Sequence, residues 1–383
     1  MENMLRLVTG RIGCGKTARI YEEIRKITEQ GDEVTLVVPE QYSFHTEKKM
    51  LEMLGARGAD RVNVVSFSFL AKNLLKKYGL NSEKSLDDST RAMLMSVALD
   101  EAGDDLQVYS RQRYSPAVIL QMLKTLKDFR QCSVTSDKIE ETLAKLKPSL
   151  LKDKLGEILL IDRTYTALVE QNYFDDDCAL DILCDVLDEH RDFDGAEVFV
   201  DGFRGFTAQE YAVLERIMRQ SAETWVTLCV DKADDEFGVF AHTFRTKRKL
   251  IRCAQKSGTD IAKPELLTRD GSIDPELNAL EKGLYSGGAE IYGEKTKKIT
   301  LCSAEDFESE CEFVACTIKR LIRTENIRCR DIAVISRSEN NYSRQIRSAL
   351  IKNGVPVFED KRQPITSEPL IEFVRSAIEI GTS

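Results

Sequence analysis

Short apolar runs alternate with helical segments over the first 79 residues, and this alternation limits most strongly what the chain can fold into. Runs of strand length occur at residues 5–9, 33–38 and 61–67, and segments of helix length at 16–30 and 70–78. Strands that alternate with helices pair in parallel, because each helix carries the chain back across the sheet. The pattern predicts an α/β fold with a parallel sheet covered on both faces.

The loop between the first strand and the first helix matches G-x-x-x-x-G-K-[ST] in full. Its glycines let the backbone curl so that successive N–H groups point at phosphate oxygens, and the following helix adds its positive dipole end. Lys16 would reach the β and γ phosphates of a nucleotide, and the Thr17 hydroxyl would bind Mg²⁺. A chance glycine-rich turn is the alternative, which the strand–loop–helix context disfavours. The predicted nucleotide-binding residues are Gly10, Arg11, Ile12, Gly13, Cys14, Gly15, Lys16 and Thr17.

A nucleotide site of this kind needs a second Mg²⁺ anchor after another buried strand, and Asp201 follows the apolar run V-F-V of the predicted strand 197–200. The alternative is an aspartate that only caps the next turn. A motor ATPase usually has glutamate at the next position to polarise the attacking water, whereas this chain has Gly202. Since glycine has no side chain to act as a base, the sequence supports nucleotide binding and does not support hydrolysis.

A helical region separates the two parts of this α/β pattern. Residues 81–194 contain no convincing strand, and Ile119, Leu123, Leu126 and Phe129 fall on one helical face. We therefore interpret the region as an insertion into the sheet domain.

A second α/β run follows a polar stretch, with strands expected at 299–302, 331–336 and 355–358. Because a sheet of three strands without a closing half is unusual, we expect the sequence to be a piece of a longer protein. The predicted domains are a P-loop (RecA-like) domain at 1–80 and 195–285, a helical insertion at 81–194, and a partial second RecA-like domain at 298–383.

Composition narrows the class of protein. Lys and Arg number 55 and Asp and Glu 64, a net charge of −9 that excludes a uniformly basic nucleic-acid coat but allows a local basic groove. No apolar run reaches the roughly 18 residues that a membrane span needs. The ten cysteines form no C-x-x-C pair and the three histidines do not cluster, so we expect reduced thiols, no catalytic zinc and a cytoplasmic location.

Three stretches resemble motifs of UvrD-like superfamily-1 helicases. V-S-F-S-F-L-A at 65–71 resembles T-F-H-x-L-A, V-D-G-F-R-G-F-T at 200–207 resembles V-D-E-F-Q-D-T-N, and I-A-V-I-S-R-S at 332–338 resembles A-I-L-Y-R-S. The resemblance implies that Arg337, in the last motif, contacts the γ-phosphate from the second motor domain. It also places the helical insertion where those helicases have their 1B subdomain.

The AddB family of helicase–nuclease subunits is the closer resemblance. It rests on V-P-E-Q at 38–41 with Phe44, on S-F-S-F-L-A, and on V-D-G-F-x-G-F-T with Gly202. It implies ATP and Mg²⁺ as cofactors, DNA and an AddA-type helicase–nuclease as partners, and a role in double-strand-break repair and recombination. The nuclease and iron–sulfur cluster of that family are implied for a C-terminal part that this sequence does not contain.

Two departures from the helicase pattern predict a degenerate motor. Gly202 replaces the acidic base, and the stretch C-V-D-K-A-D-D at 229–235 lacks the glutamine that senses the γ-phosphate in active motors. We therefore expect a subunit that binds ATP and DNA while its AddA-type partner translocates.

The helicase resemblance implies that single-stranded DNA crosses the loops after the second and third strands. Hydroxyls and backbone amides there suit phosphates, and Phe67 or Phe69 would stack on a base. The alternative is that both phenylalanines belong to the core, because they alternate as strand residues do. The predicted DNA-binding residues are Gln41, Tyr42, Ser66, Phe67 and Ser68.

A basic run, F-R-T-K-R-K-L-I-R at 244–252, has five positive charges in an otherwise acidic chain. It either follows a phosphate backbone or is a solvated helix face.

Two other classes of function compete with the AddB-like interpretation. One is a stand-alone P-loop kinase or ATPase that does not act on DNA, which the Arg337 motif and the helical insertion disfavour. The other is an interaction scaffold whose P-loop binds nothing.

Overall fold

The computed structural model describes residues 3–80, 86–170, 173–231, 238–268, 274–284, 291–337, 339–358 and 368–382. The chain divides into two compact units, Met1–Tyr292 and Gly293–Ser383. No helix in the described ranges combines the length and apolarity that a bilayer crossing requires.

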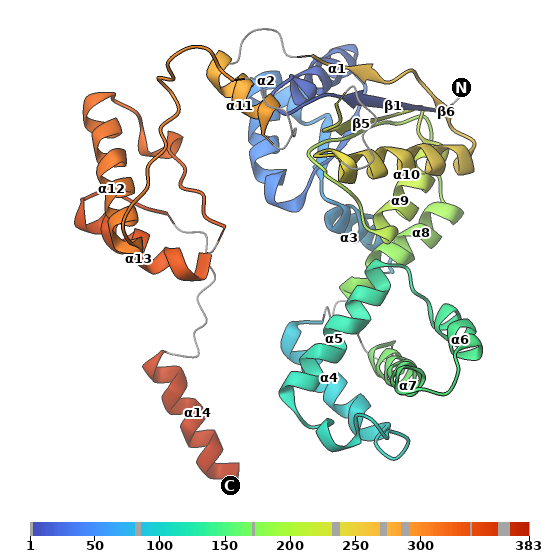
Figure 1. The fold of residues 1–383 in the computed structure, drawn as a ribbon. Coiled ribbons are helices and arrows are strands. Elements are labelled where there is room, and N and C mark those ends of the chain that lie inside the picture. The colour runs from blue at the N-terminus through green and yellow to red at the C-terminus, as the bar shows by residue number, and fades with distance from the viewer. Residues whose placement is uncertain are drawn as a thin grey trace. The chain divides into compact units, whose positions relative to one another are not determined.

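A parallel seven-stranded sheet forms the centre of the first unit (Figure 1), with strand order β3-β2-β4-β5-β1-β6 and β7 also paired to β1. This confirms the predicted parallel α/β fold. Its strands are β1 (Met4–Thr9), β2 (Val34–Val37), β3 (Val62–Val65), β4 (Glu197–Val200), β5 (Glu223–Leu228), β6 (Asp260–Ile261) and β7 (Glu265–Leu266).

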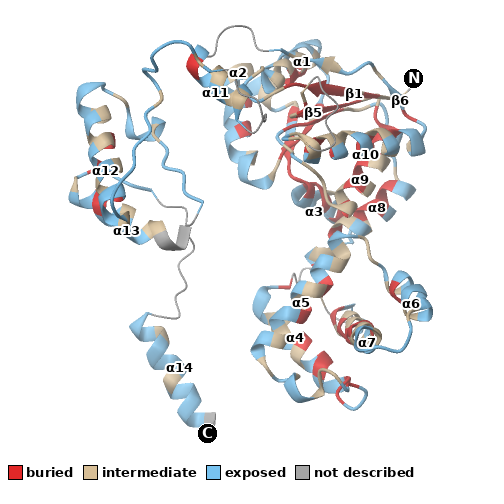
Figure 2. Ribbon diagram, in the orientation of Figure 1, coloured by how far each residue is buried: buried red, intermediate tan, exposed pale blue. Residues whose placement is uncertain are grey.

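The two faces of the sheet bury alternate residues of each strand, as a period of two requires. On one face Val8 and Phe199 pack with α1 (Lys16–Gln30) and α2 (Ser43–Ala59). On the other face Leu7 and Val200 belong to a larger core. Figure 2 shows the strands buried between these layers. The helices of the second face are α3 (Phe67–Lys77), α8 (Ala179–Glu189), α9 (Ala208–Gln220) and α10 (Ala241–Ser257).

The region between β3 and β4 contains a separate helical core in which Leu126 is buried and Ile119, Leu123 and Phe129 pack against it. The predicted helical face therefore packs inward. Its elements are α4 (Asp88–Glu101), η2 (Ser110–Gln112), α5 (Pro116–Gln131), α6 (Ser136–Lys145), α7 (Leu150–Glu170) and η3 (Asp176–Cys178).

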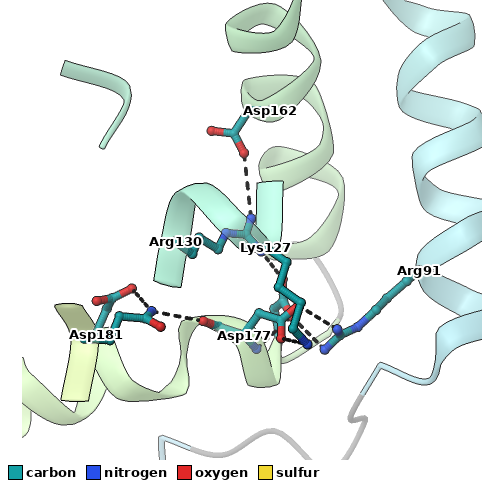
Figure 3. A network of polar contacts seen from close by, with 8 residues as sticks. Arg91, Lys127, Arg130, Asp162, Asp177 and Asp181 are labelled. Atoms are coloured by element: carbon teal, nitrogen blue, oxygen red, sulfur yellow. Dashed lines mark hydrogen bonds and ion pairs between the residues drawn. The ribbon is translucent and has the colours of Figure 1, made fainter. Parts of the chain in front are cut away.

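An ion-pair network joins these helices to the sheet domain (Figure 3). Arg91 of α4 contacts Asp177 at 2.7 Å, and Arg130 of α5 contacts the buried Asp175 at 2.5 Å. On the sheet side, Gln209 of α9 donates to the carboxylate of Asp181 at 2.7 Å. Because η3 and α8 follow one another directly, these contacts anchor α4 and α5 beside the start of α9.

The third strand ends earlier than the sequence predicts. Residues 61–67 were expected to be extended, but β3 ends at Val65 and α3 begins at Phe67. Ser66 explains the difference, because its side chain accepts a hydrogen bond from the Phe69 N–H and so caps the helix.

The regular elements that the structure describes in the second unit are all helices, and the strands expected at 299–302, 331–336 and 355–358 are not formed there. A strand exists only when its backbone groups pair with a neighbour, and Leu301 and Ile335 are 97% and 93% exposed. A small core around Ala315 and Leu350 holds the helices together. These helices are α12 (Phe307–Thr324) and α13 (Glu339–Lys352), with the short η4 (Cys329–Asp331) beside them. The described residues of the last helix, α14 (Pro369–Thr382), are not part of this core.

Candidate nucleotide-binding site

The glycine-rich loop connects β1 to α1, and three of its glycines adopt left-handed backbone conformations. Gly10, Gly13 and Gly15 have φ of 151°, 74° and 86°. A Cβ on Gly10 would overlap the Cys14 Sγ and the Leu267 carbonyl oxygen, so this position has no room for a side chain. These conformations give the motif a tight curl of the kind in which successive backbone N–H groups can point toward one anion.

Lys16 lies over this curl. Its ammonium donates to the carbonyl oxygens of Gly10 and Arg11 at 2.9 and 2.8 Å, and lies 3.4 Å from the Cys229 Sγ. These partners are at the carboxyl ends of β1 and β5, the edge at which open parallel sheets bind ligands. The ammonium is therefore positioned at the mouth of the loop.

Asp201 follows β4 at the same edge of the sheet. Its side chain accepts a hydrogen bond from the Thr227 hydroxyl, its backbone N–H donates to Val37 at 3.0 Å, and it is 8% exposed. Burial raises the pKa of the Tyr21 hydroxyl on α1, and the negative charge of Asp201 raises it further. Because Thr17 precedes Tyr21 by four residues, its exposed hydroxyl lies on the same side of α1.

Arg11 has a contact set that the motif did not predict. Its guanidinium forms ion pairs with Asp231 at 2.6 Å and Glu281 at 3.0 Å, and it lies over the ring of Phe240 at 5.5 Å. Glu281 belongs to α11 (Pro275–Gly283). The side chain of Arg11 thus anchors the loop to segments that are distant in sequence, and no local signal reveals such partners.

Gly202 also has a left-handed backbone, with φ of 84°. A Cβ there would lie 3.3 Å from the Pro39 Cδ and 3.9 Å from the Tyr42 Cδ2. The loop after β4 therefore packs directly on the segment after β2, and a side chain added at Gly202 would press against Pro39.

The predicted DNA-binding residues separate into exposed and buried groups. Gln41 and Tyr42 form part of η1 (Glu40–Tyr42) and are exposed, as is Ser68. Ser66 and Phe67 are 6% and 3% exposed.

Phe67 packs edge-on against Phe203 and Phe206, with ring centroids 5.5 and 6.1 Å apart. For Phe67 the structure thus favours the core alternative. Phe69, which is 52% exposed, is the ring available to a base.

A cleft of about 480 Å³ opens beside Phe69, between α3, α5, η3 and the start of α9. Ser68, Phe69 and Lys72 line one wall, and Lys127 and Gln131 line another. Sequence reasoning missed Lys72, although its spacing of three residues from Phe69 on a helix is a signal that could have revealed it. Four acidic side chains also line the cleft: Glu40, Asp176, Asp177 and Glu210.

Arg337 is in the second unit, in the irregular segment before α13, and is exposed. The structure does not place it relative to the P-loop.

Comparisons with known proteins identify the family to which these features belong. The family model described as "ADDB, N-terminal" matches residues 7–281, which include the P-loop, Asp201 and the helical insertion. The chain belongs to the AddB family. A model of the UvrD-like helicase C-terminal domain matches residues 239–363. The resemblance stated from the motifs is thereby confirmed.

Members of the AddB family similar to this chain include proteins named as the B-type subunit of an ATP-dependent helicase/deoxyribonuclease. The protein from Caldanaerobacter subterraneus subsp. tengcongensis is 31% identical over 98% of this chain and 33% of its own length. Those from Thermoanaerobacter sp. and Clostridium novyi are 31% and 30% identical, each over 98% of this chain and 34% of their own length. The chain spans about a third of the length of these curated relatives.

Proposed function

We propose that this chain is the ATP-binding, helicase-like portion of an AddB-type subunit in an ATP-dependent DNA helicase/deoxyribonuclease that acts in double-strand-break repair and recombination. The observation that carries the proposal is the left-handed glycine loop between β1 and α1, with Lys16 at its mouth and Asp201 at the same sheet edge. Membership of the AddB family supplies the class of enzyme.

The residues present fit a Mg²⁺–triphosphate. Backbone N–H groups of residues 10–17 would hold the phosphates, and Lys16 would exchange its two carbonyl partners for phosphate oxygens. Thr17 and Asp201 would hold the Mg²⁺, directly or through its water ligands. β5 separates β4 from β1, a distance of about 10 Å between strand axes, and Mg²⁺ usually keeps several waters when it bridges groups so spaced.

The motor of this chain is degenerate in our proposal. Gly202 has no side chain and therefore supplies no general base. The chain therefore binds ATP without appreciable turnover by itself, and an AddA-type subunit supplies translocation. Arg337 contacts the γ-phosphate when the second unit docks.

The cleft beside Phe69 and the exposed η1 support a single-stranded DNA path over the ends of β2 and β3. Phe69 and Tyr42 offer rings for base stacking, while Gln41, Ser68 and Lys72 offer donors to phosphates. The setting is the cytoplasm, where such repair acts in bacteria. We place the nuclease, and the iron–sulfur cluster that the AddB resemblance implies, in a part of the subunit that this chain does not span.

A nucleotide titration tests the proposal. Lys16→Ala should weaken binding of a fluorescent ATP analogue with Mg²⁺ by at least about tenfold, because it removes a charge-assisted contact to two phosphates. Lys26→Ala, on the outer face of the same helix, is the matched control and should bind as the wild type does. Equal affinities for Lys16→Ala and the wild type would rule out the P-loop assignment.

A turnover assay separates this proposal from a stand-alone P-loop ATPase. The chain should release phosphate from ATP no faster than a blank, with or without single-stranded DNA. Rapid hydrolysis that Asp201→Ala abolishes would support the stand-alone enzyme instead.

A further inference from the structure

Helix α10 has a charge pattern unlike the rest of this acidic chain. Its sequence, AHTFRTKRKLIRCAQKS, contains six lysines and arginines and no aspartate or glutamate. In a chain with 64 acidic residues in 383, a helix of this length would have about three by composition alone.

The structure arranges most of these charges on one side. The side chains of α10 that pack inward are Thr243, Thr246, Leu250 and Ala254, all buried. The exposed cations follow one another at spacings of three, one, three and four residues, and at about 100° per residue they fall within an arc of roughly 100°. We call them the α10 basic face: Arg245, Arg248, Lys249, Arg252 and Lys256.

Arg204, in the loop after β4, extends this face. The Thr246 hydroxyl donates to the Arg204 carbonyl oxygen at 3.2 Å. A Cβ on the next residue, Gly205, would lie 2.8 Å from the His242 Nε2, so the loop runs tightly along the start of α10. Arg204 is exposed, and because its backbone contacts Thr246, the neighbour of Arg245, it adds a sixth cation near this end of the face.

Three of these six cations have no acidic partner in the part of the chain that the structure describes. Lys256 lies 4.0 Å from the Glu215 carboxylate, and Lys249 lies over the ring of Tyr211 at 5.3 Å. Arg204, Arg245 and Arg252 form no ion pair with any residue that the structure describes. Like charges three and four residues apart destabilise an isolated helix, so the face retains a repulsion that an external polyanion would relieve.

We propose that the α10 basic face binds the phosphate backbone of duplex DNA. From Arg245 to Lys256 the face is about 16 Å long, which equals roughly five base-pair steps at 3.4 Å. Sites for single-stranded nucleic acid add exposed aromatic rings for stacking. The one Phe, Tyr or Trp of α10, Phe244, is partly buried and packs on the core. Cationic side chains without exposed aromatic rings beside them contact the phosphate backbone of DNA and do not distinguish its bases.

This inference rests on the proposed function only in taking DNA as the polyanion. It assigns the two forms of DNA to two places. Single strands bind where Tyr42 and Phe69 are exposed, at the ends of β2 and β3. The duplex binds along the solvent side of α10, in the helical layer formed by α3, α8, α9 and α10.

The test is equilibrium binding of the whole chain to a blunt 20-base-pair duplex over a range of salt concentrations. Arg245→Gln/Arg252→Gln keeps helix propensity and removes two phosphate contacts. Log Kd should then depend less steeply on log salt by about 1.8, and the duplex should bind at least about tenfold more weakly at low salt. Arg25→Gln/Lys26→Gln removes the same charge from α1, on the opposite face of the sheet, and should leave both quantities unchanged.

Three outcomes would overturn the proposal. The first is an unchanged affinity and salt slope in Arg245→Gln/Arg252→Gln. The second is an equal loss in the α1 control, which would mean that only net charge matters. The third is that the wild type binds polyglutamate through these arginines and binds no duplex, which would assign the face to an acidic protein. Normal Mg-ATP binding with any of these results would leave the nucleotide proposal intact.

Discussion

Gly202 shows how one residue affects both chemistry and backbone. It stands where motor ATPases usually have a glutamate, so its lack of a side chain removes a general base. Its φ of 84° and the contact of its Cβ position with Pro39 add a second effect. L-residues adopt this left-handed conformation only with strain. Substitution of Gly202 by glutamate would therefore have to shift the backbone of the loop after β4.

Substitution of Gly202 should therefore reduce stability and create no activity. Gly202→Ala and Gly202→Glu should each lower the free energy of unfolding by about 1–3 kcal/mol, because both force a non-glycine residue into a left-handed conformation. Urea unfolding measures this, and phosphate release measures turnover. A Gly202→Glu protein that is as stable as the wild type and hydrolyses ATP would contradict both expectations.

Glu197 couples protonation to stability at the opposite edge of the sheet. Burial, with the negative charge of its register partner Glu223, raises the pKa of Glu197 to about 7 from 4.5. Its Oε2 is buried without a hydrogen-bond partner. Between these two pKa values, Glu197 is protonated in the folded state and ionised in the unfolded state. The free energy of unfolding should therefore fall as pH rises from about 4.5 to about 7.

Glu197→Gln should remove this part of the pH dependence and stabilise the protein above pH of about 7, because the amide has no charge to desolvate. Urea midpoints at about pH 5 and about pH 8 measure the effect. Glu22→Gln, on the exposed side of α1, is the control. If Glu197→Gln shows the same difference between the two midpoints as the wild type, Glu197 is not responsible.

At the scale of elements, the ion-pair network between α4, α5, η3 and α8 determines where the helical insertion lies. Arg130 and Asp175 have side chains only 16% and 5% exposed. A buried ion pair adds little net stability, but loss of one partner leaves an uncompensated charge. The network therefore holds one wall of the cleft beside Phe69 at a defined place.

Arg130→Ala should lower the free energy of unfolding by about 1–3 kcal/mol, because the buried Asp175 then loses its closest cation and keeps Arg91 at 2.9 Å. Arg163 of α7 pairs with Glu140 at the surface, where both side chains are about half exposed. Arg163→Ala should cost less than about 1 kcal/mol. Similar losses of unfolding free energy in the two variants would show that the buried network stabilises the fold no more than a surface ion pair does.

At the scale of the whole molecule, the described nucleotide and cleft residues lie in the unit 1–292, whereas Arg337 lies in 293–383. The first unit has its own sheet and cores. It should therefore fold and bind nucleotide without the second.

A fragment of residues 1–292 should bind ADP within about twofold of the whole chain but lose at least about fivefold of its preference for ATP, since Arg337 would read the γ-phosphate. Arg337→Ala in the whole chain should reproduce that loss, and Arg330→Ala, another exposed arginine nearby, should not. Equal ATP preference in the fragment and the whole chain would exclude Arg337 from this role.

Local sequence patterns predicted much of the first unit, because those patterns have local causes. The G-x-x-x-x-G-K-T loop, the apolar strands and the helical face of α5 depend on backbone freedom and periodicity within a few residues. The prediction of a strand through Phe67 was wrong, because the capping side chain of Ser66 outweighed strand propensity. The prediction of strands in the second unit was also wrong, since a strand needs partners that no local pattern guarantees.

The sequence by itself determined the family, the parallel α/β architecture and the loop that suits a phosphate, because each follows from residue types at short spacing. Only the tertiary structure decided which side chains face solvent and which meet across the fold. It buried Phe67 and exposed Phe69, set Arg11 between Asp231 and Glu281, and aligned the cations of α10 with Arg204. These arrangements depend on how distant segments pack, and packing sums many weak contacts that no short stretch of sequence contains.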